Sequence, residues 1–234
     1  DSVVRDPATA EALKPWYRQF CKRPCFHDAY LQAFNRPNVT LVDTAGRGID
    51  RVTPRGVVAN GQEFELDCLV YATGFEVGTA YTRRAGYDLV GRGGITLNAK
   101  WAEGISTLHG MQSRGFPNCF FFGPQQAGFT VNFPHLLEEQ SRHVAYIVRQ
   151  ALDRGARTVE VSEQAERDWV ETIIRLSGLG RQFLEECTPG YYNNEGKPGE
   201  RNGQDGFYGA GSVAFFRLLA DWRERGDLAG LELS

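Results

Sequence analysis

The stretch that decides the fold is Asp67-Cys68-Leu69-Val70-Tyr71-Ala72-Thr73-Gly74-Phe75. Its apolar residues follow one another without alternation, which is typical of a strand in a parallel sheet that is covered on both faces. The run stops at Thr73-Gly74, where small residues let backbone N–H groups approach a pyrophosphate closely. The stretch therefore predicts an α/β fold, although taken alone it also fits a buried strand that simply ends in a glycine turn.

The composition limits the class of protein. The chain has 234 residues, 41% of them hydrophobic, and a net charge of -3 from 26 Lys and Arg against 29 Asp and Glu. This balance excludes wholesale disorder and a strongly basic nucleic-acid binder. No apolar run reaches the roughly 18 residues of a membrane span. The 5 cysteines lack the regular spacing of a disulfide scaffold, so we expect a cytoplasmic protein.

Met111 is the single methionine, and the chain begins with Asp-Ser-Val-Val. We therefore expect it to be the back part of a longer protein.

The first third of the chain predicts short elements. Asp6-Pro7 fits the cap and first-turn proline of a helical segment within residues 1–18. Asn38–Asp43 is expected to be a short strand, and Asn60-Gly61 is the strongest hairpin signal in the chain. A small meander is predicted from Ile49–Val52, Gly56–Val58 and Glu63–Leu66.

The remainder predicts helices joined by glycine-containing loops. A short apolar strand, Cys119–Phe122, runs into Gly123-Pro124. Apolar residues at helical spacing then predict helices over Phe133–Arg154, Ser162–Leu176 and Val213–Arg225. Gly155 is expected to close the first of these helices, and Gly178–Gly211 to form a loop.

A set of short motifs occurs in a fixed order along nearly the whole chain. They are Lys22-Arg23-Pro24, Phe34-Asn35-Arg36-Pro37-Asn38-Val39, Leu41-Val42-Asp43, Thr53-Pro54-Arg55-Gly56-Val57, Asp67 to Phe75, Gly115-Phe116-Pro117-Asn118, Gly123-Pro124 and Asn132. In this order and spacing they resemble the C-terminal part of Baeyer-Villiger monooxygenases, flavoproteins that insert one oxygen atom of O2 next to a ketone carbonyl. The run Tyr191-Tyr192-Asn193-Asn194-Glu195-Gly196 is similar to members that act on large cyclic or polycyclic ketones.

The resemblance implies FAD and NADPH as cofactors, and a ketone and O2 as small-molecule partners. It also implies the C-terminal parts of two Rossmann-like dinucleotide-binding domains, plus C-terminal helices and a lid loop. Residues 1–20 would end a helical segment, 21–66 would complete the NADP-binding domain, and 67–234 would belong to the FAD-binding domain, with the lid at about 178–211. The family's two G-x-G-x-x-G loops are not among these residues, so we expect the chain to need upstream segments and to be inactive by itself.

Lys22 and Arg23 match the adjacent Lys-Arg pair of the family. A guanidinium stays protonated, so Arg23 is the expected catalytic residue that holds negative charge during oxygenation. The compact ammonium of Lys22 suits the 2'-phosphate of NADPH. Without the resemblance, both residues would fit a solvated basic surface shared with Arg18.

Other positions are assigned by the same resemblance. Thr73, Gly74, Asn132 and Phe133 are expected to contact the flavin cofactor, the last two at a helix N-terminus. Tyr191 is expected to lie on a lid that covers NADP. The loop after Gly123-Pro124 departs from the family pattern, and its residues Gln125, Gln126 and Phe129 are expected to shape the ketone pocket.

Metal binding is not expected. Cys21 and Cys25 with His27 lack a second pair at zinc spacing, and His135 and His143 are too far apart for an i, i+4 pair.

Two rival functions stay open: a flavin-containing monooxygenase that hydroxylates nitrogen or sulfur, and a non-catalytic fragment that lacks its cofactor loops. Lys22-Arg23 argues against the first, and a ketone-against-thioether product assay would separate it.

Overall fold

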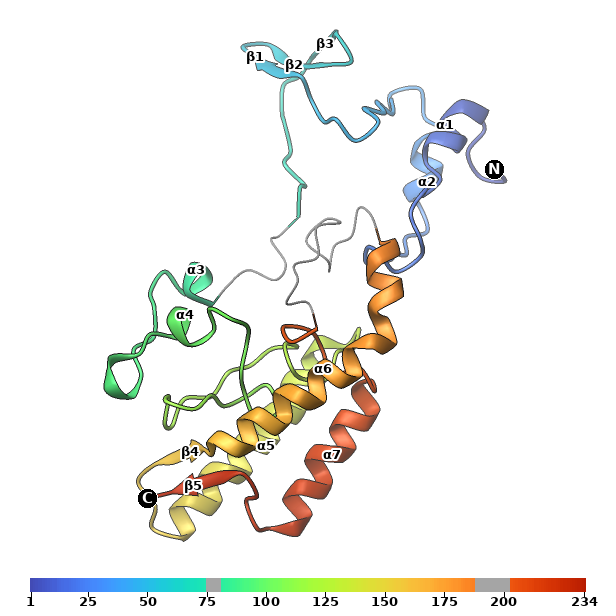
Figure 1. The fold of residues 1–234 in the computed structure, drawn as a ribbon. Helices are drawn as coiled ribbons and strands as arrows, with labels where there is room; N and C mark the ends of the chain where they lie inside the picture. The colour runs from blue at the N-terminus through green and yellow to red at the C-terminus, as the bar shows by residue number, and fades with distance from the viewer. Residues whose placement is uncertain (75–80, 188–202) are drawn as a thin grey trace. The chain divides into compact units, whose positions relative to one another are not determined.

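The computed structural model describes residues 1–74, 81–187 and 203–234, with the side chains of residues 178–185 left aside. The chain divides into two compact units, Asp1–Val77 and Gly78–Ser234, here named unit 1 and unit 2 (Figure 1).

Unit 1 begins with a short capped helix, α1, which spans Pro7–Ala12. The side chain of Asp6 accepts a hydrogen bond from the backbone N–H of Thr9 at 2.8 Å. Pro7 stands in the first turn, where a missing N–H leaves nothing unpaired. The predicted helix start is therefore confirmed. A second short helix, α2 (Tyr30–Ala33), is not anticipated by the sequence patterns.

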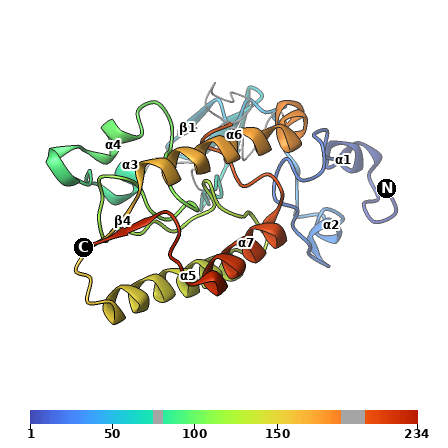
Figure 2. The ribbon, with the colours of Figure 1, turned by 60° about the horizontal axis from the view of Figure 1, so that its bottom comes forward.

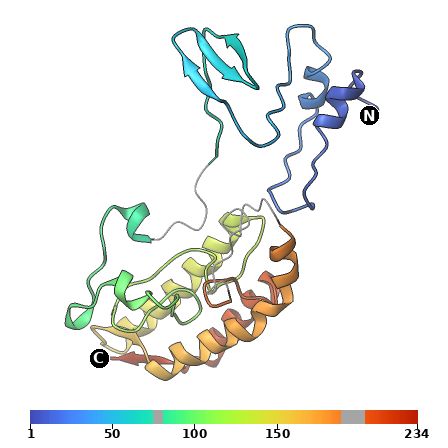
Figure 3. The same ribbon diagram turned by 45° about the horizontal axis from the view of Figure 1, so that its top comes forward.

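The predicted meander of unit 1 is confirmed. Strands β1 (Arg51–Thr53), β2 (Gly56–Ala59) and β3 (Gln62–Glu65) form an antiparallel sheet in that order (Figure 3). Ala59 pairs with Gln62, so Asn60-Gly61 is a two-residue hairpin loop. Both loop residues have positive φ, 52° and 76°, as a type I′ turn requires.

The three other predicted strands are wrong for the described residues. Residues 38–43 and 119–122 have no assigned strand, and neither do residues 67–74. The side chains of Val70 and Tyr71 are 79% and 73% exposed, where a doubly covered strand was expected. A parallel strand takes its hydrogen bonds and its cover from other segments, and the described residues supply neither here.

The other two segments are held by scattered hydrogen bonds. The carbonyl of Asp43 accepts a hydrogen bond from the Asn60 side chain at 2.8 Å. The N–H of Phe121 donates to the carbonyl of Met111 at 2.8 Å. Both segments therefore contact loops, and no adjacent strand within the described residues pairs with them.

Unit 2 places its long helices on both sides of a folded loop region. In Figure 2, α5 and α7 lie side by side, and α6 runs along the opposite side of the loops. The elements are α3 (Tyr81–Ala85), the 3-10 turn η1 (Arg92–Gly94), α4 (Leu97–Lys100), α5 (Phe133–Asp153), β4 (Val159–Val161), α6 (Glu163–Glu186), α7 (Ser212–Arg225) and β5 (Leu231–Leu233). Strand β4 pairs antiparallel with β5, which ties the end of the chain to the segment after α5.

The predicted helices are confirmed, with one change in length. Helix α5 ends just before Gly155, which has φ +67° and provides the left-handed conformation that terminates helices. Helix α6 extends beyond the predicted Leu176 to Glu186, because good helix formers offset the cost of about 1 kcal/mol for each of Gly178 and Gly180. Residues 178–186, placed in the lid by the resemblance, are therefore helical.

The main core of unit 2 packs α6 and α7 against the loop region. Its buried members are Leu108, Met111, Ala127, Val161, Trp169, Ile173, Phe215 and Leu219. A second cluster joins α5 to the β4–β5 pair through Ile147, Ala151, Val159, Trp222 and Leu228. The loop that leads into α5 is therefore anchored in the core through Ala127.

Helices and strands occur together, consistent with an α/β fold. Of the helices in the described ranges, none combines the length and the apolar character that crossing a membrane requires.

Candidate active site

The loop from Gly123 to Asn132 leads to the N-terminus of α5. Asn132 is the N-cap, and its side-chain oxygen accepts a hydrogen bond from the backbone N–H of His135 at 3.4 Å. Val131 and Phe133 on either side of the cap are 83% and 38% exposed. The positive end of the helix dipole is thus open at the surface of unit 2, among apolar side chains.

Gln126 is fully buried in this loop, with none of its surface exposed. Its amide nitrogen donates to the carbonyls of Ile105 at 2.6 Å and Gln204 at 3.0 Å, and its amide oxygen accepts from Thr107 Oγ1 at 2.5 Å. Its own carbonyl accepts from Trp169 Nε1 at 3.0 Å. Gln126 has a φ of +52°, a left-handed backbone conformation that is unfavourable for a residue other than glycine. Its hydrogen bonds offset that cost. Every polar group of its side chain is used to join segments of the protein.

Gln125 and Phe129 lie in the same loop, before and after the buried Gln126. Gln125 Oε1 is buried and has no hydrogen-bond partner among the described residues. The ring of Phe129 stacks on that of Phe207, with centroids 4.6 Å apart and planes at 12°. The loop therefore offers one unsatisfied acceptor and an aromatic stack next to the helix N-terminus.

Gln140, which the sequence analysis did not single out, fastens the beginning of this loop. It lies on α5, is fully buried, and exchanges two hydrogen bonds with the backbone of Gly123. A signal was available, because Gln140 follows Leu136 by one helical turn and is one of the polar residues on the buried face of α5.

The predicted charged pair belongs to unit 1. Arg23 is exposed and Lys22 half-buried, in a segment without regular secondary structure. The carbonyl of Arg23 accepts a weak hydrogen bond from the thiol of Cys25 at 3.8 Å. A solvent-facing guanidinium on an irregular segment is available to a ligand or to a partner segment.

The other predicted cofactor residues of unit 1 are also exposed. Thr73 and Gly74 lie on the extended segment 67–74, and Gly74 has φ +85°, a conformation that favours glycine. Gln125, Gln126, Phe129, Asn132 and Phe133 belong to unit 2. Tyr191 lies outside the described residues.

Two buried histidines of unit 2 lie against each other. The rings of His109 and His143 have centroids 5.4 Å apart, and both rings contact Trp222. Burial, with a contribution from Arg225, lowers the pKa of His109 to about 3. Burial, followed by His109 and Arg223, lowers the pKa of His143 to about 2. Both rings are neutral at physiological pH, and they belong to the core.

The comparisons with known proteins come from sequence and from structure. No family model matches the chain. Pentalenolactone D synthase of Streptomyces arenae is 60% identical over 235 residues, which is 100% of this chain and 40% of that protein. A Baeyer-Villiger monooxygenase of Stachybotrys chlorohalonatus is 49% identical over 100% of this chain and 37% of its own length. The chain matches the C-terminal part of Baeyer-Villiger monooxygenases.

Solved structures agree with this match. The polycyclic ketone monooxygenase of Thermothelomyces thermophila has a TM-score of 0.94 and 40% identity, over 100% of this chain and 38% of that chain. A steroid monooxygenase bound to NADP has a TM-score of 0.79 and 29% identity, over 99% of this chain and 43% of that chain. The chain thus spans about two fifths of the length of the Baeyer-Villiger monooxygenases it matches.

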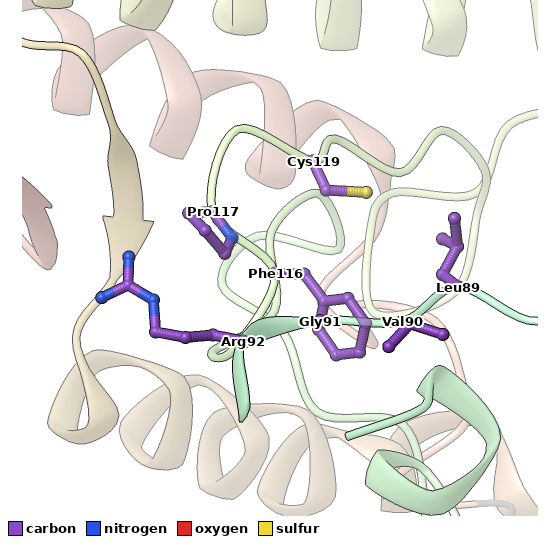
Figure 4. A pocket seen from close by; sticks show the side chains of 7 residues that line it. All are labelled: Leu89, Val90, Gly91, Arg92, Phe116, Pro117 and Cys119. Atoms are coloured by element: carbon purple, nitrogen blue, oxygen red, sulfur yellow. The ribbon is translucent and has the colours of Figure 1, made fainter. Parts of the chain in front are cut away.

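A separate pocket of about 340 Å³ lies in unit 2, and none of the predicted site residues is among those that line it. It is lined by Leu89, Val90, Gly91, Arg92, Phe116, Pro117 and Cys119 (Figure 4). Arg92 points away from Leu89 and Cys119 in Figure 4 and pairs with the buried Glu160 at 3.3 Å. Burial raises the pKa of the Cys119 thiol, which disfavours the reactive thiolate. We assign no chemistry to this pocket.

Within the described ranges, no group of three or more His, Cys, Asp or Glu side chains is placed to hold a metal ion.

Proposed function

We propose that the chain is the C-terminal part of an FAD- and NADPH-dependent Baeyer-Villiger monooxygenase. Such an enzyme inserts one oxygen atom of O2 next to a ketone carbonyl and releases an ester or lactone, while the second oxygen atom leaves as water. The observation that carries the proposal is the 60% identity with pentalenolactone D synthase along the entire chain.

The proposed substrate is a cyclic ketone fused to further rings, and the product is a lactone. The support comes from two relatives, one of which is a synthase named for a lactone and the other a polycyclic ketone monooxygenase.

We infer that residues 21–66 complete an NADP-binding domain and that residues 67–234 belong to an FAD-binding domain, both Rossmann-like. The exposed run at 67–74 supports this division. Val70 and Tyr71 carry apolar surface that a sheet supplied by upstream segments would cover, and burying an exposed valine is worth about 2 kcal/mol. In the complete enzyme, such a sheet would cover the apolar side chains of residues 67–74 and would pair with their backbone N–H and C=O groups.

The residues of unit 2 fit a flavin. The open N-terminus of α5 offers backbone N–H groups and a positive dipole end to an electron-rich ring edge, and Val131 and Phe133 offer apolar contact. One relative is named an FAD-binding monooxygenase. When bound and reduced by NADPH, FAD supplies the activation of O2. In unit 1, the small residues Thr73 and Gly74 allow backbone N–H groups to come close to the cofactor.

Arg23 and Lys22 are proposed to act on negative charge. The Arg23 guanidinium keeps its proton, so it stabilises the anionic states of oxygenation without donating that proton to them. Lys22 is proposed to bind the 2'-phosphate of NADPH as a point charge. Arg23 is exposed, which leaves its five N–H donors accessible.

The loop residues take different proposed roles. Gln125 and Phe129 shape the ketone pocket, with the unsatisfied Gln125 Oε1 as an acceptor for a polar group. Gln126 is proposed to shape the pocket indirectly, because the hydrogen bonds of its buried amide fix the backbone of the loop. Tyr191 stays a prediction from the family resemblance.

The experiment uses the complete enzyme, with its upstream segments, and compares Arg23→Ala with Arg51→Ala. Arg51 is an exposed arginine of unit 1 on β1 and serves as the matched control. We expect Arg23→Ala to reduce flavin at a measurable rate with NADPH but to form lactone at least about a hundredfold more slowly, because charge stabilisation is lost. Arg51→Ala should match wild type in both steps.

Wild-type lactone formation by Arg23→Ala would refute the role of Arg23. A wild-type enzyme that oxidises a thioether or an amine but no cyclic ketone would refute the Baeyer-Villiger assignment itself.

A further inference from the structure

The geometry points to Gln140 as a positioning residue for the oxygenation proposed above. Its side-chain amide holds the start of the loop that shapes the ketone pocket, while its helix, α5, begins at the end of that loop. The inference rests on the proposed function.

The contact itself is a two-bond clamp. Gln140 Nε2 donates to the carbonyl of Gly123 at 2.8 Å, and Gln140 Oε1 accepts from the backbone N–H of Gly123 at 3.1 Å. One side chain thus satisfies both backbone groups of a buried residue, as a neighbouring strand would do in a sheet. Gln140 is fully buried, so water does not replace either bond.

Gly123 needs such support because its conformation is unusual. Its φ is +151°, and a Cβ atom at this position would lie 3.0 Å from Gln125 Oε1. The preceding carbonyl, that of Phe122, is held at 3.0 Å by the hydroxyl of Tyr81. The turn into Pro124 is therefore fixed by two side chains from outside the loop, one for each consecutive carbonyl.

The clamp closes the loop on a single helix. The loop leaves the core at Gly123 and ends at Asn132, the N-cap of α5, and Gln140 reaches back from α5 to Gly123. Because both ends are tied to one rigid element, the positions of Gln125 and Phe129 are set relative to the α5 N-terminus. The clamp therefore sets the distance between the proposed ketone pocket, at Gln125 and Phe129, and the proposed flavin contact at the α5 N-terminus.

The consequence is specific to positioning. Without the clamp, the fold and the flavin contacts should persist, because the apolar clusters that hold unit 2 together are built from other residues. The loop would sample other conformations, and a displacement of about 1 Å in a reacting pair costs up to about a hundredfold in rate. Reducing equivalents from NADPH would then be lost without oxygenation of the ketone.

The test uses the complete enzyme with Gln140→Leu and Gln140→Glu. Gln150→Leu and Gln150→Glu are matched controls, because Gln150 lies on the same helix and bonds only to Arg154 in the described residues, at 3.5 Å. The readouts are the flavin spectrum, the rate of flavin reduction by NADPH, and the lactone formed per NADPH consumed.

We expect Gln140→Leu to keep the flavin spectrum and the rate of flavin reduction, but to form about tenfold less lactone per NADPH at every pH. We use coupling for the lactone formed per NADPH consumed. At low pH, Gln140→Glu should have the coupling of wild type, because the protonated carboxyl both donates to and accepts from Gly123. Coupling should fall as pH rises and the carboxylate loses its donor. The Gln150 variants should match wild type.

Unchanged coupling in Gln140→Leu overturns the inference. If that variant does not fold, Gln140→Glu decides: pH-dependent coupling relative to wild type supports the inference, and pH-independent coupling overturns it. A wild-type enzyme that forms no lactone overturns the proposed function, and this inference with it.

Discussion

Lowering the pH is expected to destabilise the chain through His109 and His143. Both histidines are buried, at 6% and 1% exposure, and burial is the main cause of their lowered pKa values, about 3 and about 2. An unfolded histidine has a pKa of about 6.5, so between that pH and the folded pKa the unfolded state binds more protons than the folded state. Stability is therefore fully present above about pH 6.5 and is lost progressively below it.

The size of the effect follows from linkage. From about pH 7.5 to about pH 5.0, each histidine that stays neutral in the folded state costs about 2 kcal/mol of unfolding free energy. Arg223 and Arg225 of α7 add to the effect, because a protonated ring would face their positive charges.

The assay is urea unfolding of the chain at both pH values, followed by the fluorescence of Trp169 and Trp222, which contact these rings. His143→Leu should lose about 2 kcal/mol less than wild type over this interval. His135→Leu is the control, because His135 lies on the same helix and is exposed. If His143→Leu and wild type lose the same free energy, the neutral buried pair is not what makes the chain acid-sensitive.

Three further changes test other parts of the structure. Asn132→Ala should lower the unfolding free energy by about 1 kcal/mol through loss of the α5 cap, whereas Asn132→Asp should not, as thermal unfolding would show. Glu166→Gln should cost about 2 kcal/mol in urea, because Glu166 accepts from Arg114 N at 2.7 Å and pairs with Lys100 at 2.7 Å, and the exposed Glu163→Gln should cost under about 0.5 kcal/mol. The isolated chain, incubated with excess FAD and then separated from free FAD, should show no flavin absorbance. A yellow chain would contradict our proposal that the cofactor loops lie in upstream segments.

The sequence predicted the elements whose causes are local. The Asp6-Pro7 helix start, the Asn60-Gly61 hairpin and helix α5 were each encoded by a cap, a turn or a period within a few residues. The strands at 38–43 and 67–74 failed for the opposite reason. An apolar run indicates that a segment prefers to be buried, but it does not indicate which other segment will pair with it.

The candidate site was predicted to a similar extent. Asn132 was predicted to lie at a helix N-terminus, and the structure has it as the N-cap of α5. The internal bonding of Gln126 was not readable, because its partners at Ile105, Thr107 and Gln204 come together only in the fold. The cofactor and catalytic roles of Lys22 and Arg23 rest on the resemblance, since no local physical rule separates them from an ordinary basic surface.

Two loops of unit 2 are held by different kinds of side chain, and the difference has a functional meaning under the proposed activity. The backbone of Arg114 and Gly115 is held by the carboxylates of Glu166 and Glu160, whereas the loop that leads to α5 is held by the neutral amides of Gln126 and Gln140. A buried carboxylate under that loop would oppose the negative charge that builds up during oxygenation, and in a medium of low polarity that repulsion acts over many ångströms. A neutral amide supplies the same two hydrogen bonds without that field. At high pH Gln140→Glu lacks the donor, as Gln140→Leu does, and adds an adverse charge, so lactone formed per NADPH should fall below that of Gln140→Leu once the carboxyl ionises.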